Sequence, residues 1–120
     1  MGVNTAPERP VAVVGETNTF SVSFTSILDG SELLTGTPDV VEVTSTDLTI
    51  VNFTPTSDKG TVSTTALTIN NVTVPIGEAV QFKVTGHLAA TAEYTIKITA
   101  GTDATPAQTK VRKIIFKAEA

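Results

Sequence analysis

The chain has 120 residues and a formal charge of −4 at pH 7, with 40% hydrophobic residues and neither cysteine nor tryptophan. This length suits one domain, which would bury roughly two-thirds of the surface that the unfolded chain exposes. The acidic balance argues against nucleic acid as the main partner, because phosphate binding needs a concentrated positive field. Without cysteine, neither a disulfide framework nor a cysteine-based metal site can form.

Residues 1–10 are predicted to be an extended arm, and residues 11–120 one domain. Pro7 and Pro10 exclude a helix in the arm and cannot donate to a strand ladder. In isolation such an arm frays, whereas in an assembly it can lie along a neighbouring subunit, which makes both prolines candidate partner contacts. The N-terminus has no basic stretch followed by an apolar one, so we expect no secretory signal. No apolar run approaches the ~18 residues of a membrane span, so we expect no membrane partner.

The first half of the chain alternates apolar and polar residues in the manner of half-buried strands. The predicted strands are Val11–Val14, Thr19–Thr25, Val40–Val43 and Asp47–Phe53. In the second of these, Phe20, Val22 and Phe24 face one way. Asp29-Gly30 predicts a turn, and Thr37-Pro38 predicts a break before the third strand.

The second half continues the pattern with closely spaced turn signals. Thr61–Thr65 and Ala66–Val74 are predicted to supply one or two strands, and further strands are predicted at Val80–Thr85, Glu93–Thr99 and Thr109–Ala118. Val80, Phe82 and Val84 share one face of the strand at 80–85, and Tyr94, Ile96 and Ile98 share one face of the strand at 93–99. Asn70-Asn71 predicts a bend, since Asn tolerates a left-handed backbone, and Pro75-Ile76-Gly77 predicts a turn. With abundant β-branched residues and no amphipathic helix, the sequence predicts an all-β, two-sheet sandwich.

Leu88 and Tyr94 have a spacing that resembles the tyrosine corner of immunoglobulin-like and fibronectin type III sandwiches. In that corner the Tyr ring packs below a Greek-key loop, and its hydroxyl bonds a backbone group a few residues upstream. A buried Tyr needs such a partner for its hydroxyl. The alternative is an ordinary core tyrosine in a hairpin.

The last predicted strand carries half of the chain's eight basic residues, which are Lys110, Arg112, Lys113 and Lys117. Ile114 and Phe116 point one way, whereas Ile115 stands between Lys113 and Lys117 on the other face. One interpretation is an edge strand that lysines protect against stray pairing. The other is a contact surface for an acidic partner or a sister subunit, made by Lys113, Ile115 and Lys117.

The sequence gives no candidate catalytic, cofactor-binding or metal-binding residue. His87 is the single histidine, and a lone histidine lacks the co-ligands that a zinc site requires. The acidic residues lack the spacing of calcium loops or of paired catalytic carboxylates, and no glycine-rich phosphate loop follows a strand. We therefore expect no enzymatic activity, no cofactor and no metal.

Several stretches together resemble a known family. They are Phe20–Leu34 with its L-D-G turn, Val80–Gly86, Tyr94–Ile98 and Thr109–Phe116. In this order they are similar to small immunoglobulin-like virion proteins of tailed bacteriophages, among them head-decoration (cement) proteins. The chain departs from fibronectin type III modules in lacking their usual tryptophan, whose volume Phe24 is expected to fill.

This resemblance implies a non-enzymatic protein that binds the outer capsid surface and reinforces contacts between major capsid subunits. It also implies a homo-oligomer, with a trimer favoured, located in the virion after synthesis in the cytoplasm of the bacterial host. One alternative is a carbohydrate- or host-surface-binding module of a tail fibre, for which Phe53 is the one plausible exposed aromatic platform. Another is a tail-tube or connector protein, which would form hexameric rings.

The corner hypothesis predicts a defined stability loss for Tyr94→Phe. Removing the hydroxyl deletes a buried hydrogen bond and orphans its acceptor, so the free energy of unfolding should fall by about 1–2 kcal/mol. Chemical denaturation measures this change, and an unchanged midpoint would refute the corner.

Overall fold

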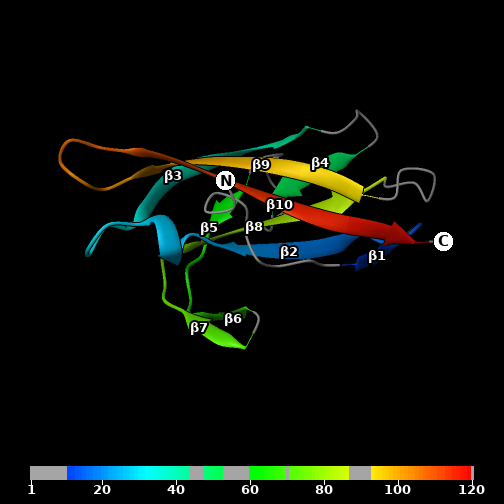
Figure 1. Ribbon diagram of the computed structural model, residues 1–120, viewed down its shortest axis with the longest axis horizontal. Coiled ribbons are helices and arrows are strands. Elements are labelled where there is room, and N and C mark those ends of the chain that lie inside the picture. The colour runs from blue at the N-terminus through cyan, green and yellow to red at the C-terminus, as the bar shows by residue number, and fades with distance from the viewer. Residues whose placement is uncertain (1–10, 44–47, 53–59, 70, 87–92, 120) are drawn as a thin grey trace.

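The computed structural model describes residues 11–43, 48–52, 60–69, 71–86 and 93–119. These residues form an immunoglobulin-like β-sandwich (Figure 1). Its strands are β1 (Val11–Val13), β2 (Asn18–Ser23), β3 (Leu34–Glu42), β4 (Thr49–Asn52), β5 (Thr61–Val62), β6 (Leu67–Ile69), β7 (Val72–Val74), β8 (Ala79–Thr85), β9 (Glu93–Thr102) and β10 (Thr109–Glu119). A 3-10 helix, η2 (Thr25–Ile27), follows β2. Within the described ranges, no helix is long and apolar enough to cross a membrane.

Two sheets form the sandwich. The front sheet has the strand order β1-β10-β9-β3, and the back sheet has the order β2-β8-β4, with β5 also paired to β8. The β1 strand runs parallel to β10, whereas the other described pairs are antiparallel. Because strands adjacent in sequence, such as β2 and β3, lie in different sheets, the chain crosses repeatedly between the two layers.

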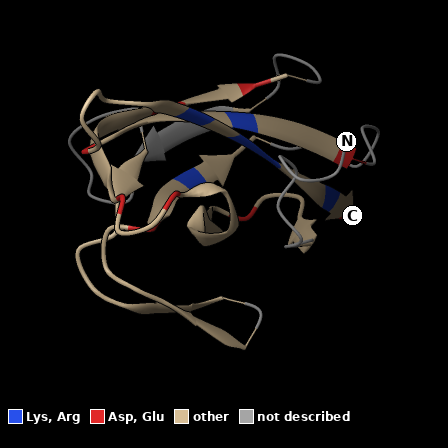
Figure 2. Ribbon diagram, turned by 60° about the vertical axis from the view of Figure 1, so that its left-hand side comes forward, with Lys and Arg blue, Asp and Glu red and all other residues tan. Residues whose placement is uncertain are grey.

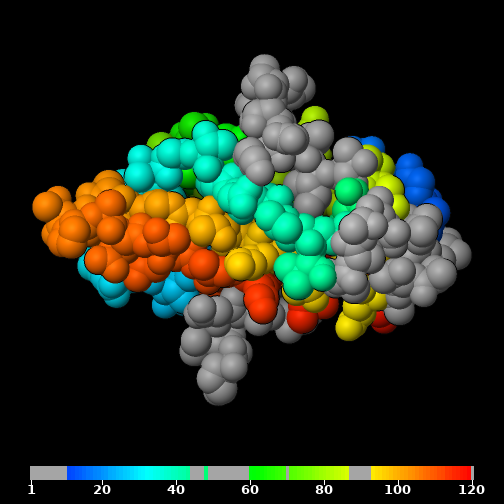
Figure 3. Space-filling view, turned by 90° about the horizontal axis from the view of Figure 1, so that it is seen from above, coloured from blue at the N-terminus to red at the C-terminus, as the bar shows by residue number. Residues whose placement is uncertain are grey.

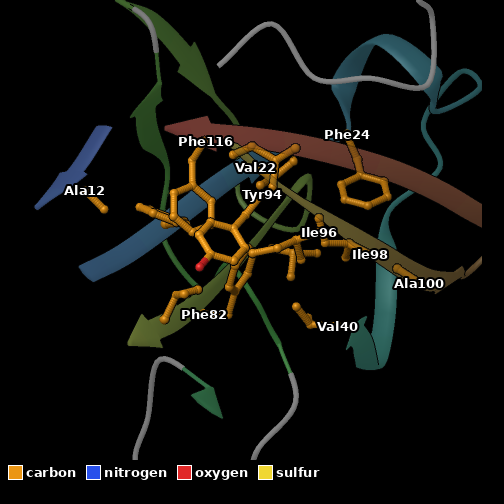
Figure 4. Close-up of a cluster of buried hydrophobic side chains, with 14 of the residues drawn as sticks. Ala12, Val22, Phe24, Val40, Phe82, Tyr94, Ile96, Ile98, Ala100 and Phe116 are labelled. Atoms are coloured by element: carbon orange, nitrogen blue, oxygen red, sulfur yellow. The ribbon is translucent and has the colours of Figure 1, made fainter. Parts of the chain in front are cut away.

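The core lies between the sheets and consists of the residues whose alternation the sequence displays. Its fully buried large side chains include Val22, Phe24, Val80, Phe82, Val84, Tyr94, Ile96, Ile98, Ile114 and Phe116 (Figure 4). The ring of Phe20 in the back sheet lies 5.0 Å from that of Phe116 in the front sheet, and Tyr94 stacks on Phe116 at 5.2 Å. Burying each such side chain contributes about 1.5–3 kcal/mol. The predicted inward faces of these strands are confirmed.

The expected break at Thr37-Pro38 is wrong. The β3 strand runs through Pro38, and its register against β9 shifts between Thr35 and Asp39. A proline is tolerated here because β3 is the last strand of the front sheet and the ladder is already irregular at this point.

The region predicted as one or two strands at Ala66–Val74 is a hairpin of β6 and β7, which extends away from the sandwich (Figure 1). Asn71 has φ 63°, as expected of a residue in a bend, and Gly77 has φ 82° in the following turn. Ile69, Val74 and Ala79 form a second, smaller buried cluster at this hairpin.

Several predicted features lie outside the described residues, among them the arm, with Pro7 and Pro10, and Leu88 of the corner. Tyr94 itself is fully buried, as a tyrosine corner requires, but its contact with Leu88 stays a prediction.

Candidate functional site

The outward face of the front sheet brings together the three basic-strand residues that the sequence singled out. Because β10 buries its even-numbered residues from Arg112 to Ala118, the odd-numbered ones point away from the core. Lys113 and Lys117 are exposed there, and Ile115 between them is half-buried. We call the outward-facing side chains of the front sheet the front surface; Figure 3 views the molecule from the side on which β3, β9 and β10 lie next to one another.

A pair of like charges occupies the middle of the front surface. The register of β9 and β10 places Lys113 directly opposite Lys97, and both side chains are exposed. Like charges in this position destabilise a sheet. The ion pairs found within the described ranges involve Lys110 rather than Lys97 or Lys113. Neither Lys97 nor Lys113 therefore has an ion-pair partner among the described residues, and Figure 2 shows where basic and acidic residues lie along the strands.

Apolar side chains surround this pair. Val41 lies opposite Lys97, and Val11 lies opposite Lys117. The exposed valines of the surface, with their exposed fractions, are Val11 (52%), Val13 (43%), Val41 (45%) and Val43 (53%). Scattered exposed apolar residues are normal, but apolar residues gathered on one face mark an interaction site.

Acidic residues lie only toward the margins of the described front surface. At one end Glu93 is opposite Lys117 and Glu119 is opposite Val13, and Asp39 is opposite Thr99 toward the other end. The centre is thus basic and apolar, although the whole chain is acidic. Such a surface suits a partner that presents carboxylates among apolar side chains.

The other two basic residues of β10 do not belong to the front surface. Lys110 Nζ lies 3.4 Å from Asp29 Oδ2 and 4.0 Å from Glu32 Oε1. Arg112 is buried and donates a hydrogen bond from Nη1 to Ser26 Oγ in η2. Both side chains tie β10 to the segment between β2 and β3, so their role is structural.

A pocket of about 440 Å³ lies at the same end of the sandwich, lined by the loops around Asp29 and Asp103. Two of its carboxylates accept backbone hydrogen bonds: Glu32 Oε1 accepts from the Asp29 N–H at 3.0 Å, and Asp103 Oδ1 accepts from the Leu33 N–H at 2.8 Å. The third, that of Asp29, pairs with Lys110. Within the described ranges, no group of three or more His, Cys, Asp or Glu residues could hold a metal ion.

The aromatic residues of the described strands do not form a sugar-stacking platform. Phe20, Phe24, Phe82, Tyr94 and Phe116 are all buried in the core. Phe53, the platform that the fibre-module alternative requires, lies outside the described residues, as does His87.

Sequence reasoning missed Lys97 and the exposed valines as members of this surface. Alternation along one strand reveals which residues share a face, but not which residue of the next strand stands beside them. Lys97 stands at an outward position of its own predicted strand, and that was the only signal available.

No protein-family model, curated protein or solved structure matches this chain.

The Lys97–Lys113 pair predicts that a charge reversal stabilises the fold. Lys97→Glu creates an opposite-charge cross-strand pair and should raise the free energy of unfolding by about 0.2–1 kcal/mol. The gain should shrink as salt is added, because exposed charges are screened. Chemical denaturation at low and high salt measures both effects.

The control is the double variant Lys97→Glu/Lys113→Glu, which restores a like-charge pair of the opposite sign. It should lose the gain. If the double variant is as stable as the single one, the two lysines do not repel each other.

Proposed function

We propose that this protein is a non-enzymatic structural protein of a tailed-phage virion. It binds the outer surface of the capsid and reinforces contacts between major capsid subunits. The sequence resemblance to small immunoglobulin-like virion proteins motivates this proposal. The observation that carries it is the front surface, where the Lys97–Lys113 pair lies among exposed valines.

The physical argument is that the front surface raises the free energy of the domain while no partner covers it. The like-charge pair disfavours the free domain, and each exposed valine leaves apolar area in water at about 25 cal/mol per Å². A partner surface with carboxylates and apolar groups relieves both costs at once. The two terms therefore favour the bound state over the free one.

Many copies of the protein on one shell can make a weak individual contact effective. A decoration protein acts in many identical copies, and each copy that touches more than one shell subunit adds a small stabilisation. A cross-link between subunits needs a stiff body rather than a catalytic cleft. The packed core, in which Tyr94 stacks on Phe116 and the tilted ring of Phe20 packs against Phe116 from the other sheet, supports such a body.

The proposal includes three further parts. The arm of residues 1–10, with Pro7 and Pro10, lies along a neighbouring subunit on the shell. The protein acts as a homo-oligomer, with a trimer at three-fold positions favoured. It is located on the capsid surface of the virion after synthesis in the cytoplasm of the bacterial host.

Ile115→Asp tests the proposal. The half-buried side chain lies at the centre of the front surface, opposite Thr95. A carboxylate there removes apolar contact and neutralises the local positive field, so binding to purified phage shells should fall at least about tenfold, the equivalent of about 1.4 kcal/mol. Co-sedimentation with shells measures binding, and thermal unfolding checks that the domain still folds.

The matched control is Val72→Asp, which places the same carboxylate at an exposed apolar position of the β6–β7 hairpin. It should bind shells as the unaltered protein does. If Ile115→Asp binds shells as well as the unaltered protein, the front surface is not the surface that binds the shell. If the unaltered protein binds no shell, the decoration function itself must be abandoned.

A further inference from the structure

Among the described strands, one long edge of β10 is unpaired along most of its length. The strand pairs with β9 from Thr109 to Lys117, but with β1 only from Lys117 to Glu119. Between Thr109 and Phe116, its other edge pairs with no strand of the described chain. An open edge of this kind is a template for an added strand.

The hydrogen bonds at the two ends of β10 reveal which backbone groups face this edge. The Thr102 N–H donates to the Gln108 carbonyl at 2.9 Å, so the even-numbered positions of β10 bond to β9. The Val14 N–H donates to the Glu119 carbonyl at 2.8 Å, so the odd-numbered positions face the β1 side. The N–H and C=O groups of Thr109, Val111, Lys113 and Ile115 therefore point out of the open edge.

The side chains beside this edge form an ordered row on the front surface. Val111 and Ile115 are half-buried, and Lys113 between them is exposed. On the opposite face, Arg112 and Ile114 are buried. A strand added at this edge would thus meet an apolar, a basic and an apolar residue at alternate positions on its outward side.

We propose that the open edge of β10 binds an extended acidic segment of the partner protein as an added strand. An acidic residue of that segment lies opposite Lys113, and apolar residues lie opposite Val111 and Ile115. Backbone hydrogen bonds hold such a strand, and the alternating side chains select it. The inference rests on the proposed function only in taking the partner to be the capsid subunit.

Charge and proline disfavour two other occupants. A second copy that paired antiparallel about Lys113 would place Lys113 against its own counterpart, and like charges directly opposite repel. A straight parallel continuation of β1 toward the N-terminus would place Pro10 opposite Phe116. The even-numbered positions of that strand face β10, as the Val14 bond shows, and proline has no N–H to donate there.

The test uses the full chain and two synthetic peptides, acetyl-TVTETVT-amide and its lysine counterpart acetyl-TVTKTVT-amide. NMR titration of the isotopically labelled protein should show that the glutamate peptide binds at least about tenfold more tightly. Its binding should slow hydrogen exchange at the amides of Val111, Lys113 and Ile115. The Lys113→Glu variant should reverse the preference and favour the lysine peptide.

A backbone variant distinguishes peptide binding through the backbone groups of the open edge from binding through the side chains of the front surface. Val111→Pro removes an outward-facing N–H without touching the bonds to β9, whereas Val111→Thr keeps that N–H in a side chain of similar shape. Peptide binding should be lost in the proline variant and retained in the threonine variant. Spectra of the free variants check that each is folded.

Equal binding of both peptides, or an unchanged preference in Lys113→Glu, would overturn the inference. So would amides of Val111, Lys113 and Ile115 that are already protected in the free protein, because this chain itself would then cover the edge. If shells bind but neither peptide does, the edge inference fails and the decoration function stands. If the glutamate peptide binds but shells do not, the edge inference stands and the decoration function fails.

Discussion

The aromatic contact across the sandwich is the interaction on which the rest of the structure depends. Phe20 of the back sheet packs on Phe116 of the front sheet, and Tyr94 stacks on Phe116 from the neighbouring strand. This contact fixes which face of β9 and β10 points inward. Because strand side chains alternate with a period of two, it also fixes which face points outward. A slip of one residue would bury Lys113 and expose Phe116. The same strand register therefore determines both the core and the front surface.

The outward face is not arranged for the stability of the isolated domain. The sheet places two lysines directly opposite each other and leaves valines of β1 and β3 in water. Among the described strands, β10 also has an unpaired edge of backbone groups beside Lys113. Violations of the rules that stabilise a sheet are expected where a surface serves a partner. Here these violations occur together on the outward face of the front sheet and on one edge of β10. On the inward face of β10, the buried Arg112 donates a hydrogen bond to Ser26 in η2.

Much of the fold follows from the sequence, and the reasons for the failures are physical. Alternation predicted the inward faces of β2, β8, β9 and β10, and it grouped Lys113 with Ile115 and Lys117, because these are properties of single strands. It could not place Lys97 beside Lys113, because strand register is set by packing between distant segments. The break predicted at Pro38 was also wrong. A proline by itself indicates a break, but the irregular ladder of the edge strand β3 accommodates it.

The central claim is that the front surface is where the partner binds, and lysine footprinting tests it most directly. Acetylation of amines would be compared between the free protein and the protein on purified shells, using Lys83 of the back sheet as an internal reference, since Lys83 pairs with Thr19 in the opposite layer. The account predicts that Lys97 and Lys113 become protected on the shell while Lys83 keeps its reactivity. Protection of Lys83 with Lys97 and Lys113 unchanged would contradict it.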